Sequence, residues 1–155
     1  MRTSRSHGFT LVEMLVTLAV FAVLMMIAIP SMQPFLQSQS VKNASMDINS
    51  TVALARSEAI KRNATVDVTA NNAADWSQGW TVSQGTSVIR KQDALGNVVI
   101  TPSSGSFSFD GNGRMTTTGS TFTVAPLHKI GSQPLCLTVT VGATGRVEST
   151  KVTCP

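Results

Sequence analysis

Histidine, cysteine and tyrosine are scarce in this chain, whose 155 residues include two histidines, two cysteines and no tyrosine. His7 and His128 lie far apart, and His128 has no cysteine or acidic cluster beside it, so neither a metal site nor a catalytic triad is predicted. The acidic residues are scattered singly, and no glycine-rich loop with its lysine is present to hold a phosphate. These absences argue against an enzyme, and no cofactor is predicted.

Charged residues are also few, at 13% of the chain. Twelve Lys and Arg residues stand against eight Asp and Glu residues, a formal net charge of +4. This excess is too small to indicate nucleic-acid binding by itself. The second half of the chain is rich in Thr, Ser, Val and Gly, which is typical of short strands and turns. Length and composition together predict one small domain with a single core.

The amino-terminal part contains a long apolar run. From Phe9 to Ile29 the only ionisable residue is Glu13, and about twenty apolar residues in helical form can cross a bilayer. An intramembrane carboxylate is costly unless it finds a partner, so Glu13 is a candidate functional residue. Arg2 and Arg5 precede the run and favour the cytoplasmic side, which predicts that the chain beyond about Pro30 lies outside the inner membrane.

The segment Gly8-Phe9-Thr10-Leu11-Val12-Glu13 resembles the prepilin signature of type IV pilins and type II secretion pseudopilins. The alternatives are a secretory signal peptide or a plain single-span anchor. Against a signal peptide, the apolar run is long, Glu13 interrupts it, and residues 28–32 make a poor cleavage site. The resemblance implies that a membrane peptidase cuts after Gly8 and methylates Phe9, so that the mature chain keeps the helix and loses the basic leader.

A second helical signal follows the apolar run. Small and apolar residues recur at helical spacing and form one stripe of an amphipathic helix: Val41, Ala44, Ile48, Val52, Ala55 and Ala59. A helix from Thr10 to Arg62 is about 80 Å long at 1.5 Å per residue, so its first half is expected to project from the domain. Pro30 and Pro34 are expected to interrupt it as a break, a kink or a melted segment.

After residue 63 the apolar period becomes two. The short strands predicted from this pattern cover 65–69, 79–83, 87–91, 97–101, 106–110, 121–125, 135–141 and 145–149. Residues 111–113 and 142–145 are predicted tight turns, because Gly and Asn tolerate positive φ. The polar segment 71–78 is the expected mobile loop. Trp76 and Trp80 are interpreted as strand and core residues rather than ligand platforms.

The order of these parts resembles the GspH/FimT family of minor pilins and pseudopilins. The residues that carry this narrower resemblance are 54–62, Gly79-Trp80-Thr81-Val82, 109–114, Cys136-Leu137 and Gly145-Arg146-Val147. The resemblance implies an α+β, pilin-like fold, with a long N-terminal helix packed on an antiparallel β-sheet domain. It divides the chain into a cleaved leader, a transmembrane and assembly helix, and a periplasmic or extracellular head made of an amphipathic helix and a β domain: 1–8, 9–37 and 38–155, with the head divided at 38–62 and 63–155.

The resemblance also implies partners and roles. The expected partners are the prepilin peptidase, the inner membrane, and other minor and major pilins or pseudopilins. Glu13 of one subunit is expected to set register by pairing with the amino group of Phe9 in a neighbouring subunit, since an α-amino group with a pKa of about 7.7 to 8.0 can be cationic. The expected location is the inner membrane as a single span, followed by the filament or pilus tip.

Cys136 and Cys154 are predicted to form a disulfide, because they are an even pair in an exported domain. Two unpaired thiols are the alternative. A simple hairpin centred on residues 142–145 is not expected to place the two cysteines opposite each other. An irregular carboxy-terminal segment is therefore predicted.

Three functions remain open on this reading. The chain is a minor pilin of a tip or priming complex, the equivalent pseudopilin of a type II secretion system, or a DNA-binding minor pilin for natural transformation. The DNA-binding members carry a basic Gly-Arg-x-Arg pattern, which here reads Gly145-Arg146-Val147-Glu148 with an acid in place of the second arginine. Arg146, Lys151 and Lys129 are the candidate DNA-binding residues, with Arg114 as a further contributor, and weak binding is expected at most.

Overall fold

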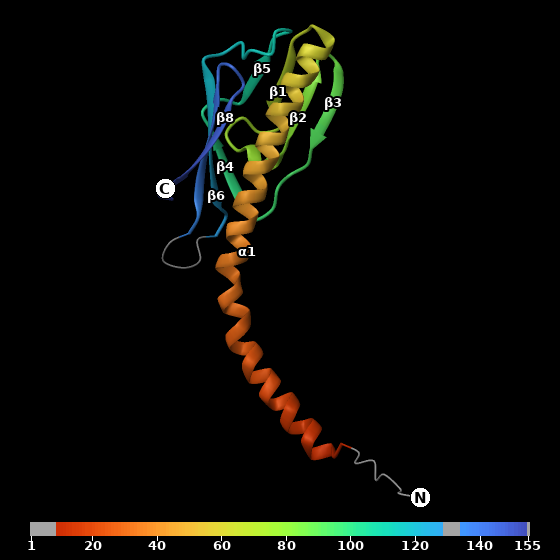
Figure 1. Ribbon diagram of the computed structural model, residues 1–155, viewed down its shortest axis with the longest axis vertical. Helices are drawn as coiled ribbons and strands as arrows, with labels where there is room; N and C mark the ends of the chain where they lie inside the picture. The colour runs from red at the N-terminus through yellow and green to blue at the C-terminus, as the bar shows by residue number, and fades with distance from the viewer. Residues whose placement is uncertain (1–8, 129–133, 155) are drawn as a thin grey trace, which may run out of the picture.

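The computed structural model describes residues 9–128 and 134–154, apart from the side chain of Pro30. One long helix, α1 (Leu11–Arg62), is followed by eight strands and a short 3-10 helix, η1 (Trp76–Gln78). The C-terminal half of α1 lies against the β domain, whereas the N-terminal half projects from it alone (Figure 1). The predicted pilin-like architecture, a long helix on an antiparallel β domain, is confirmed.

Helix α1 runs without a break through Pro30 and Pro34, so the predicted interruption of the helix by a break or a melted segment is wrong. A proline removes one backbone donor and bends a helix, but the turns on either side keep their own hydrogen bonds. The helix instead curves over its projecting half (Figure 1). Its C-terminal end is capped by Asn63, whose φ of 47° lies in the left-handed region and whose backbone N–H bonds to Ala59 and Ile60 carbonyls.

The predicted apolar stripe of α1 is buried, with every one of its six residues at most 3% exposed. Helix α1 packs against both sheets, chiefly against β6, β7 and β1. Three of the six residues are alanines, and small side chains let the helix backbone approach the strands closely. The stripe therefore supplies the helical side of the core.

The strands form two four-stranded antiparallel sheets, ordered β3-β2-β1-β5 and β4-β6-β7-β8. Every predicted strand is present, with bounds that differ by a few residues at most. The observed strands are β1 (Val66–Ala70), β2 (Trp80–Gln84), β3 (Ser87–Gln92), β4 (Val98–Pro102), β5 (Ser106–Phe109), β6 (Gly119–Pro126), β7 (Cys136–Gly142) and β8 (Val147–Val152).

Aromatic side chains fill the space between the sheets. The Trp76 ring stacks on Phe107 with centroids 5.6 Å apart and meets Phe122 edge-on at 4.7 Å, while Trp80 donates its indole N–H to Thr51 of α1 at 3.0 Å. Both tryptophans are 1% exposed, as predicted for core residues. The prediction of a mobile loop over 71–78 is therefore wrong for its second half, because burial of the Trp76 indole anchors that part in the core.

Asp75 fastens this anchored segment to the second sheet. It caps η1, since its carboxylate accepts hydrogen bonds from the Ser77 N–H at 2.9 Å and the Ser77 hydroxyl at 2.8 Å. The same carboxylate lies 3.4 Å from the Ile100 N–H of β4. Burial raises the pKa of Asp75, but these hydrogen bonds lower it more, so that the net shift is downward from 3.8. One ionised side chain thus links η1 to β4.

The carboxy-terminal hairpin is more regular than predicted. Strands β7 and β8 pair Cys136 with Val152, because both residues lie equally far from the turn that joins the strands. Cys154 follows only two residues later, and its disulfide to Cys136 has a Cα–Cα distance of 5.2 Å. The predicted disulfide is present. As predicted, the hairpin does not place the two cysteines opposite each other, but the regular ladder extends to Val152, so the irregular carboxy-terminal segment begins only at Thr153.

Candidate functional site

The start of α1 places Glu13 in the first helical turn. Thr10 is the N-cap residue, with φ −85° and ψ 153°, and its hydroxyl accepts a hydrogen bond from the Glu13 N–H at 3.2 Å. The spacing Thr-x-x-Glu is that of a capping box, in which the acid also suits the positive end of the helix dipole. The backbone of Glu13 thus takes part in the helix cap, and its carboxylate lies at the end of the helix where the dipole favours an acid.

The carboxylate of Glu13 forms no ion pair with any residue that the structure describes. It lies within Leu11–Ile29, a 19-residue stretch that is long and apolar enough to cross a membrane and has no share buried inside the protein. Phe9 is exposed at the end of this stretch, and Gly8 lies outside the described residues. A helix that is apolar all round needs lipid or other apolar helices around it.

The candidate DNA-binding cations do not form one patch. Arg146 lies in the turn before β8 and Lys151 near the end of β8, and both are exposed. A separation of five strand residues corresponds to about 16 Å and directs the two side chains to opposite faces. Alternation instead places Glu148 on the same face as Arg146, and Lys129 lies outside the described residues.

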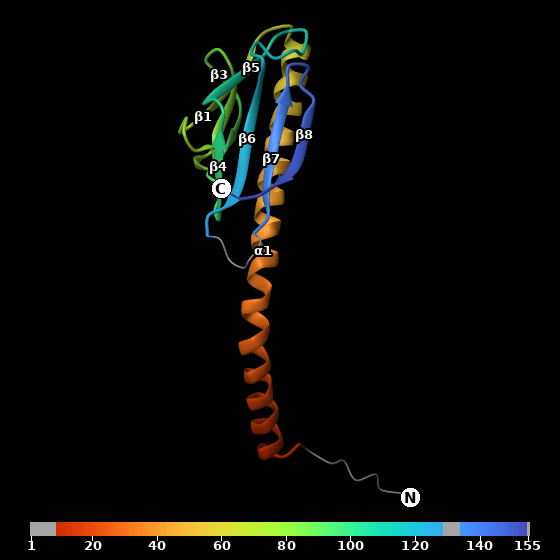
Figure 2. The same ribbon diagram turned by 90° about the vertical axis from the view of Figure 1, so that its left-hand side faces the viewer.

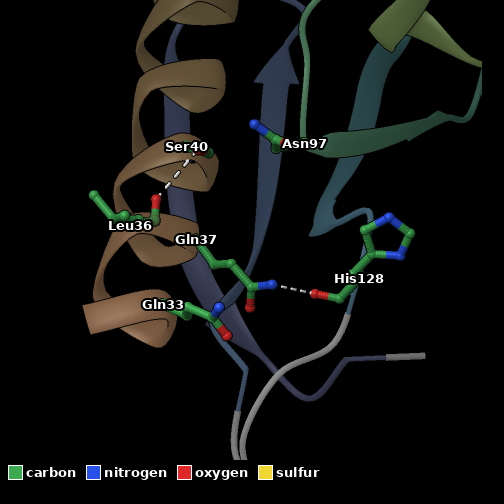
Figure 3. Close-up of a pocket in the computed structure, with 6 residues that line it drawn as sticks. All are labelled: Gln33, Leu36, Gln37, Ser40, Asn97 and His128. Atoms are coloured by element: carbon green, nitrogen blue, oxygen red, sulfur yellow. Dashed lines mark hydrogen bonds between the residues drawn. The ribbon is translucent and has the colours of Figure 1, made fainter. Parts of the chain in front are cut away.

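A pocket of about 250 Å³ lies where the head domain meets the projecting helix. Figure 3 shows the Gln33 and Gln37 side chains of α1 on the side of the loops that carry Asn97 and His128; together with Leu36 and Ser40, these residues line the pocket. Gln37 donates its amide N–H to the His128 carbonyl, whereas the imidazole ring points away from Gln37 (Figure 3). The Leu127 N–H bonds to the Asn97 carbonyl at 2.9 Å and joins the two loops.

This pocket is lined chiefly by amide and hydroxyl side chains. Its polar groups are mostly amides, and the residues described as lining it include no carboxylate or thiol that could pair with His128 in acid–base chemistry. In residues 9–128 and 134–154, no group of three His, Cys, Asp or Glu side chains is placed to hold a metal ion. The pocket is best interpreted as the contact between the head and α1 that lies nearest to the projecting half of the helix.

One residue that sequence reasoning did not select is Arg56. Its side chain lies over Gly113 and Gly145 in the turns 111–113 and 142–145, and each of these glycines is followed directly by an arginine, Arg114 or Arg146. The sequence did offer a signal for these arginines, because all three fall in the segments that carry the family resemblance. Their proximity depends on pairing between distant parts of the chain, which one sequence does not reveal.

Comparison with known proteins agrees with this geometry. Residues 3–29 match the prokaryotic N-terminal methylation motif, and residues 44–145, well over half of the chain, match the type II transport protein GspH family. The chain belongs to the GspH family. The methylation motif implies processing by a prepilin peptidase and assembly with other pilins or pseudopilins, and α1 is the membrane anchor of a C-terminal globular domain.

Solved structures support the same fold for this GspH-family chain. The type IV minor pilin FimU of Pseudomonas aeruginosa matches with a TM-score of 0.61 and 20% identity, over 78% of this chain and 92% of FimU. The minor pseudopilin EpsH of the Vibrio cholerae type 2 secretion system matches with a TM-score of 0.56 and 16% identity, over 72% of this chain and 97% of EpsH. No curated protein shows significant sequence similarity to the chain.

Proposed function

We propose that the protein is a minor pilin that inserts in the inner membrane, is cut after Gly8 by the prepilin peptidase, and joins a tip or priming complex of a type IV pilus. The head domain then lies in the periplasm until assembly. The observation that carries this proposal is the projecting half of α1, which exposes apolar side chains all round and one carboxylate. In a membrane or a helical bundle, this surface packs against lipid or the same part of other subunits.

Glu13 supplies the register of that packing. A carboxylate in an apolar bundle is costly alone and much less so beside a cation. After cleavage the new amino group of Phe9 is the nearest such cation, either from the same chain or from a neighbouring subunit. Apolar helices can pack against each other in several axial registers with similar energy. One ion pair therefore selects one register among them.

Two substitutions of Glu13 separate its two roles. Glu13→Ala removes the whole carboxyl group, whereas Glu13→Gln removes only its charge and keeps a side chain that also suits a capping box. If the ion pair sets register, both variants insert in the membrane but are depleted from the sheared filament fraction. Wild-type incorporation of Glu13→Gln would contradict the register role and leave capping as the function of Glu13.

Processing is tested at the cleavage site. Gly8→Leu is expected to keep the leader attached and to prevent entry into filaments. The reason is that the prepilin peptidase of the resembled family requires a small residue at this position. Mass spectrometry of the amino-terminal peptide measures this directly. A normally trimmed and methylated Phe9 in the variant would contradict the assignment of the cleavage site.

The second candidate function is that of a pseudopilin in a type II secretion system. The likeness to EpsH favours it, although FimU and EpsH share the fold and neither is close in sequence. A deletion strain separates the two functions: loss of surface pili with normal secretion supports the pilus role, and loss of secreted enzymes with normal pili supports the secretion role.

DNA binding has weaker support. Duplex affinity depends on several cations that neutralise neighbouring phosphates, and the exposed cations Arg146 and Lys151 point to opposite faces of β8. A tight complex with DNA at physiological salt that Arg146→Ala abolishes would favour the DNA-uptake function instead.

A further inference from the structure

The side chain of Arg56, within the last two turns of α1, lies across two turns from distant parts of the chain. A β-carbon added at Gly113 would lie 3.2 Å from Arg56 Nε, and one added at Gly145 would lie 2.9 Å from Arg56 Cδ. Both glycines have positive φ, +74° and +75°, so the turns require glycine and leave room for the arginine. The Met115 N–H bonds to the Ala143 carbonyl at 2.9 Å and holds the two turns together.

Two further arginines leave these same turns. Arg114 directly follows Gly113, and Arg146 directly follows Gly145. The next residue in each case, Met115 or Val147, packs on the core, so strand alternation directs both arginines outward. Arg56, Arg114 and Arg146 are all exposed. The three arginines therefore lie at the same end of the head: Arg56 contacts the two glycines, and Arg114 and Arg146 follow these glycines on the outer face of the turns.

None of the three arginines forms an ion pair among the residues that the structure describes. The nearby acid Glu58 is occupied by Arg62 at 2.7 Å and by Lys61 at 3.6 Å. The carboxylate of Asp110 accepts hydrogen bonds from the backbone N–H groups of Asn112 and Arg114 at 2.9 and 3.0 Å. These two acids therefore serve other partners. Glu148 lies on the same face as Arg146 but forms no ion pair with any of the three arginines among the described residues.

An apolar side chain completes this surface. Ile60 lies one helical turn beyond Arg56, contacts the turn at Gly113, and is 49% exposed. The surface made of Arg56, Ile60, Arg114 and Arg146 is called the arginine surface below. It lies at the end of the head opposite to the projecting helix, where α1 ends and β7 turns into β8 (Figure 2).

We propose that the arginine surface binds an acidic segment on the head domain of a neighbouring pilin or pseudopilin subunit. This inference rests on the proposed function, because it requires assembly with other subunits. Guanidinium groups bind carboxylates in a planar, bidentate geometry. Arginine is also enriched among the hot-spot residues that contribute most of the binding energy of an interface. An apolar residue beside the arginines excludes water from such contacts and strengthens them.

A protein partner fits this surface better than nucleic acid does. Three phosphate contacts give a salt dependence of only about 2.7 in the log–log slope, at about 0.9 per contact, which is too weak for useful duplex binding. A half-exposed isoleucine among the cations has no counterpart in a phosphate backbone. No exposed tryptophan is available to stack on bases, because both tryptophans of the chain are 1% exposed.

The experiment uses the full-length chain in cells that assemble the filament, with a photocrosslinking residue at position 60. The expected result is an adduct with another pilin or pseudopilin, whose crosslinked peptide contains Asp or Glu. The double variant Arg114→Glu/Arg146→Glu is expected to lower the adduct yield by about tenfold or more, since it reverses two contacts of the proposed interface. Exchanging the identified acid for Arg in the partner should restore the adduct.

Two controls separate binding from folding. Arg56→Met keeps an apolar stem over Gly113 and Gly145 but removes the charge, and it should also lower the adduct yield. Arg90→Glu/Lys91→Glu makes the same charge change on β3, whose exposed residues lie outside the arginine surface, and should leave the yield unchanged. Formation of the Cys136–Cys154 disulfide reports that each variant folds.

The outcomes are distinct. A chain absent from filaments would overturn the proposed function and this inference together. A chain present in filaments would overturn only this inference if it formed no adduct at position 60, or if the adduct resisted charge reversal. Retention of duplex DNA that depends on Arg114 and Arg146, with the pilin adduct unchanged, would assign the surface to nucleic acid and also overturn it.

Discussion

Reduction of the Cys136–Cys154 disulfide is expected to lower the unfolding free energy of the head by about 3 kcal/mol. The cysteines are 18 residues apart, and closing a loop of that length removes an entropy of about 11 cal/mol/K from the unfolded chain, or about 3 kcal/mol at 25 °C. In the folded head, the β7–β8 ladder already pairs Cys136 with Val152. The bond therefore adds few native contacts, and its effect falls mainly on the unfolded state.

The measurement is urea unfolding of the processed chain in detergent, followed by tryptophan fluorescence. Both tryptophans lie in the core of the head, so this signal reports on the head and not on the membrane helix. With a slope of about 1 to 3 kcal/mol per molar urea, a loss of 3 kcal/mol moves the midpoint by about 1 to 3 M.

Two forms of the experiment control for packing. Reductant opens the bond and leaves both sulfurs in place, whereas Cys136→Ala also removes a buried atom and should cost slightly more. The reasoning is refuted if oxidised and reduced protein unfold at the same urea concentration. It is also refuted if Cys136→Ala is strongly destabilised while the reduced protein is not, because packing would then dominate over loop entropy.

Three smaller predictions concern the core and the turns. Asp75→Asn should lower the unfolding free energy at pH 7 by about 1 kcal/mol, because the amide keeps one acceptor oxygen for the Ser77 N–H but loses the second, which accepts from the Ser77 hydroxyl. Because the folded pKa of Asp75 is lowered from 3.8, its contribution is present above that pH and lost as the pH falls through the folded pKa; a difference between wild type and variant that persists at pH 2 would contradict this. Ser120→Ala should be neutral or stabilising by up to about 1 kcal/mol, because the buried Ser120 hydroxyl has no hydrogen-bond partner among the described residues. A clear destabilisation in urea would show that this hydroxyl does form a hydrogen bond in the folded protein. Gly113→Ala should cost about 1 to 2 kcal/mol, since its φ is +74° and a β-carbon there would lie 2.6 Å from Ile60 Cδ1, and an unchanged midpoint would show that the turn relaxes freely.

The elements of this fold were predictable because their signals are local. The helical stripe that begins at Val41 and the alternation that begins after residue 63 each require only a few consecutive residues. The turns at 111–113 and 142–145 were predictable for the same reason, since Gly and Asn mark positive φ. Strand ends were less accurate: β8 was predicted to end at Ser149 and continues to Val152. Cross-strand pairing extended it beyond its alternating part.

The division into two sheets was not predictable from local pattern. β4 pairs with β6 and leaves β5 to pair with β1, and nothing in the strands' alternation distinguishes these partners. The segment 71–78 was misjudged because its polar residues outnumber its one large apolar side chain, Trp76. Burial of that single indole outweighs the solubility of its neighbours.

The candidate site shows the same limit. Glu13 stands out because a lone carboxylate in an apolar run is visible at once, and its capping partner Thr10 lies three residues away. Arg56 does not stand out, because an arginine on an amphipathic helix is ordinary until the fold places it against the turns at Gly113 and Gly145. Sequence spacing reveals sites built within one element, whereas sites built between elements depend on tertiary contacts.

The two halves of α1 differ in what surrounds them, and this separates stability from assembly. The C-terminal half buries one stripe against the sheets and exposes the rest, so the head is complete without any other subunit. Over Leu11–Ile29 no part of the N-terminal half is buried against the described residues of the head, so its side chains contribute no packing to the described core. Polar substitutions there should impair insertion or assembly while the tryptophan-monitored unfolding midpoint stays unchanged. A midpoint that falls with such substitutions would mean that the projecting helix folds back on the head in solution.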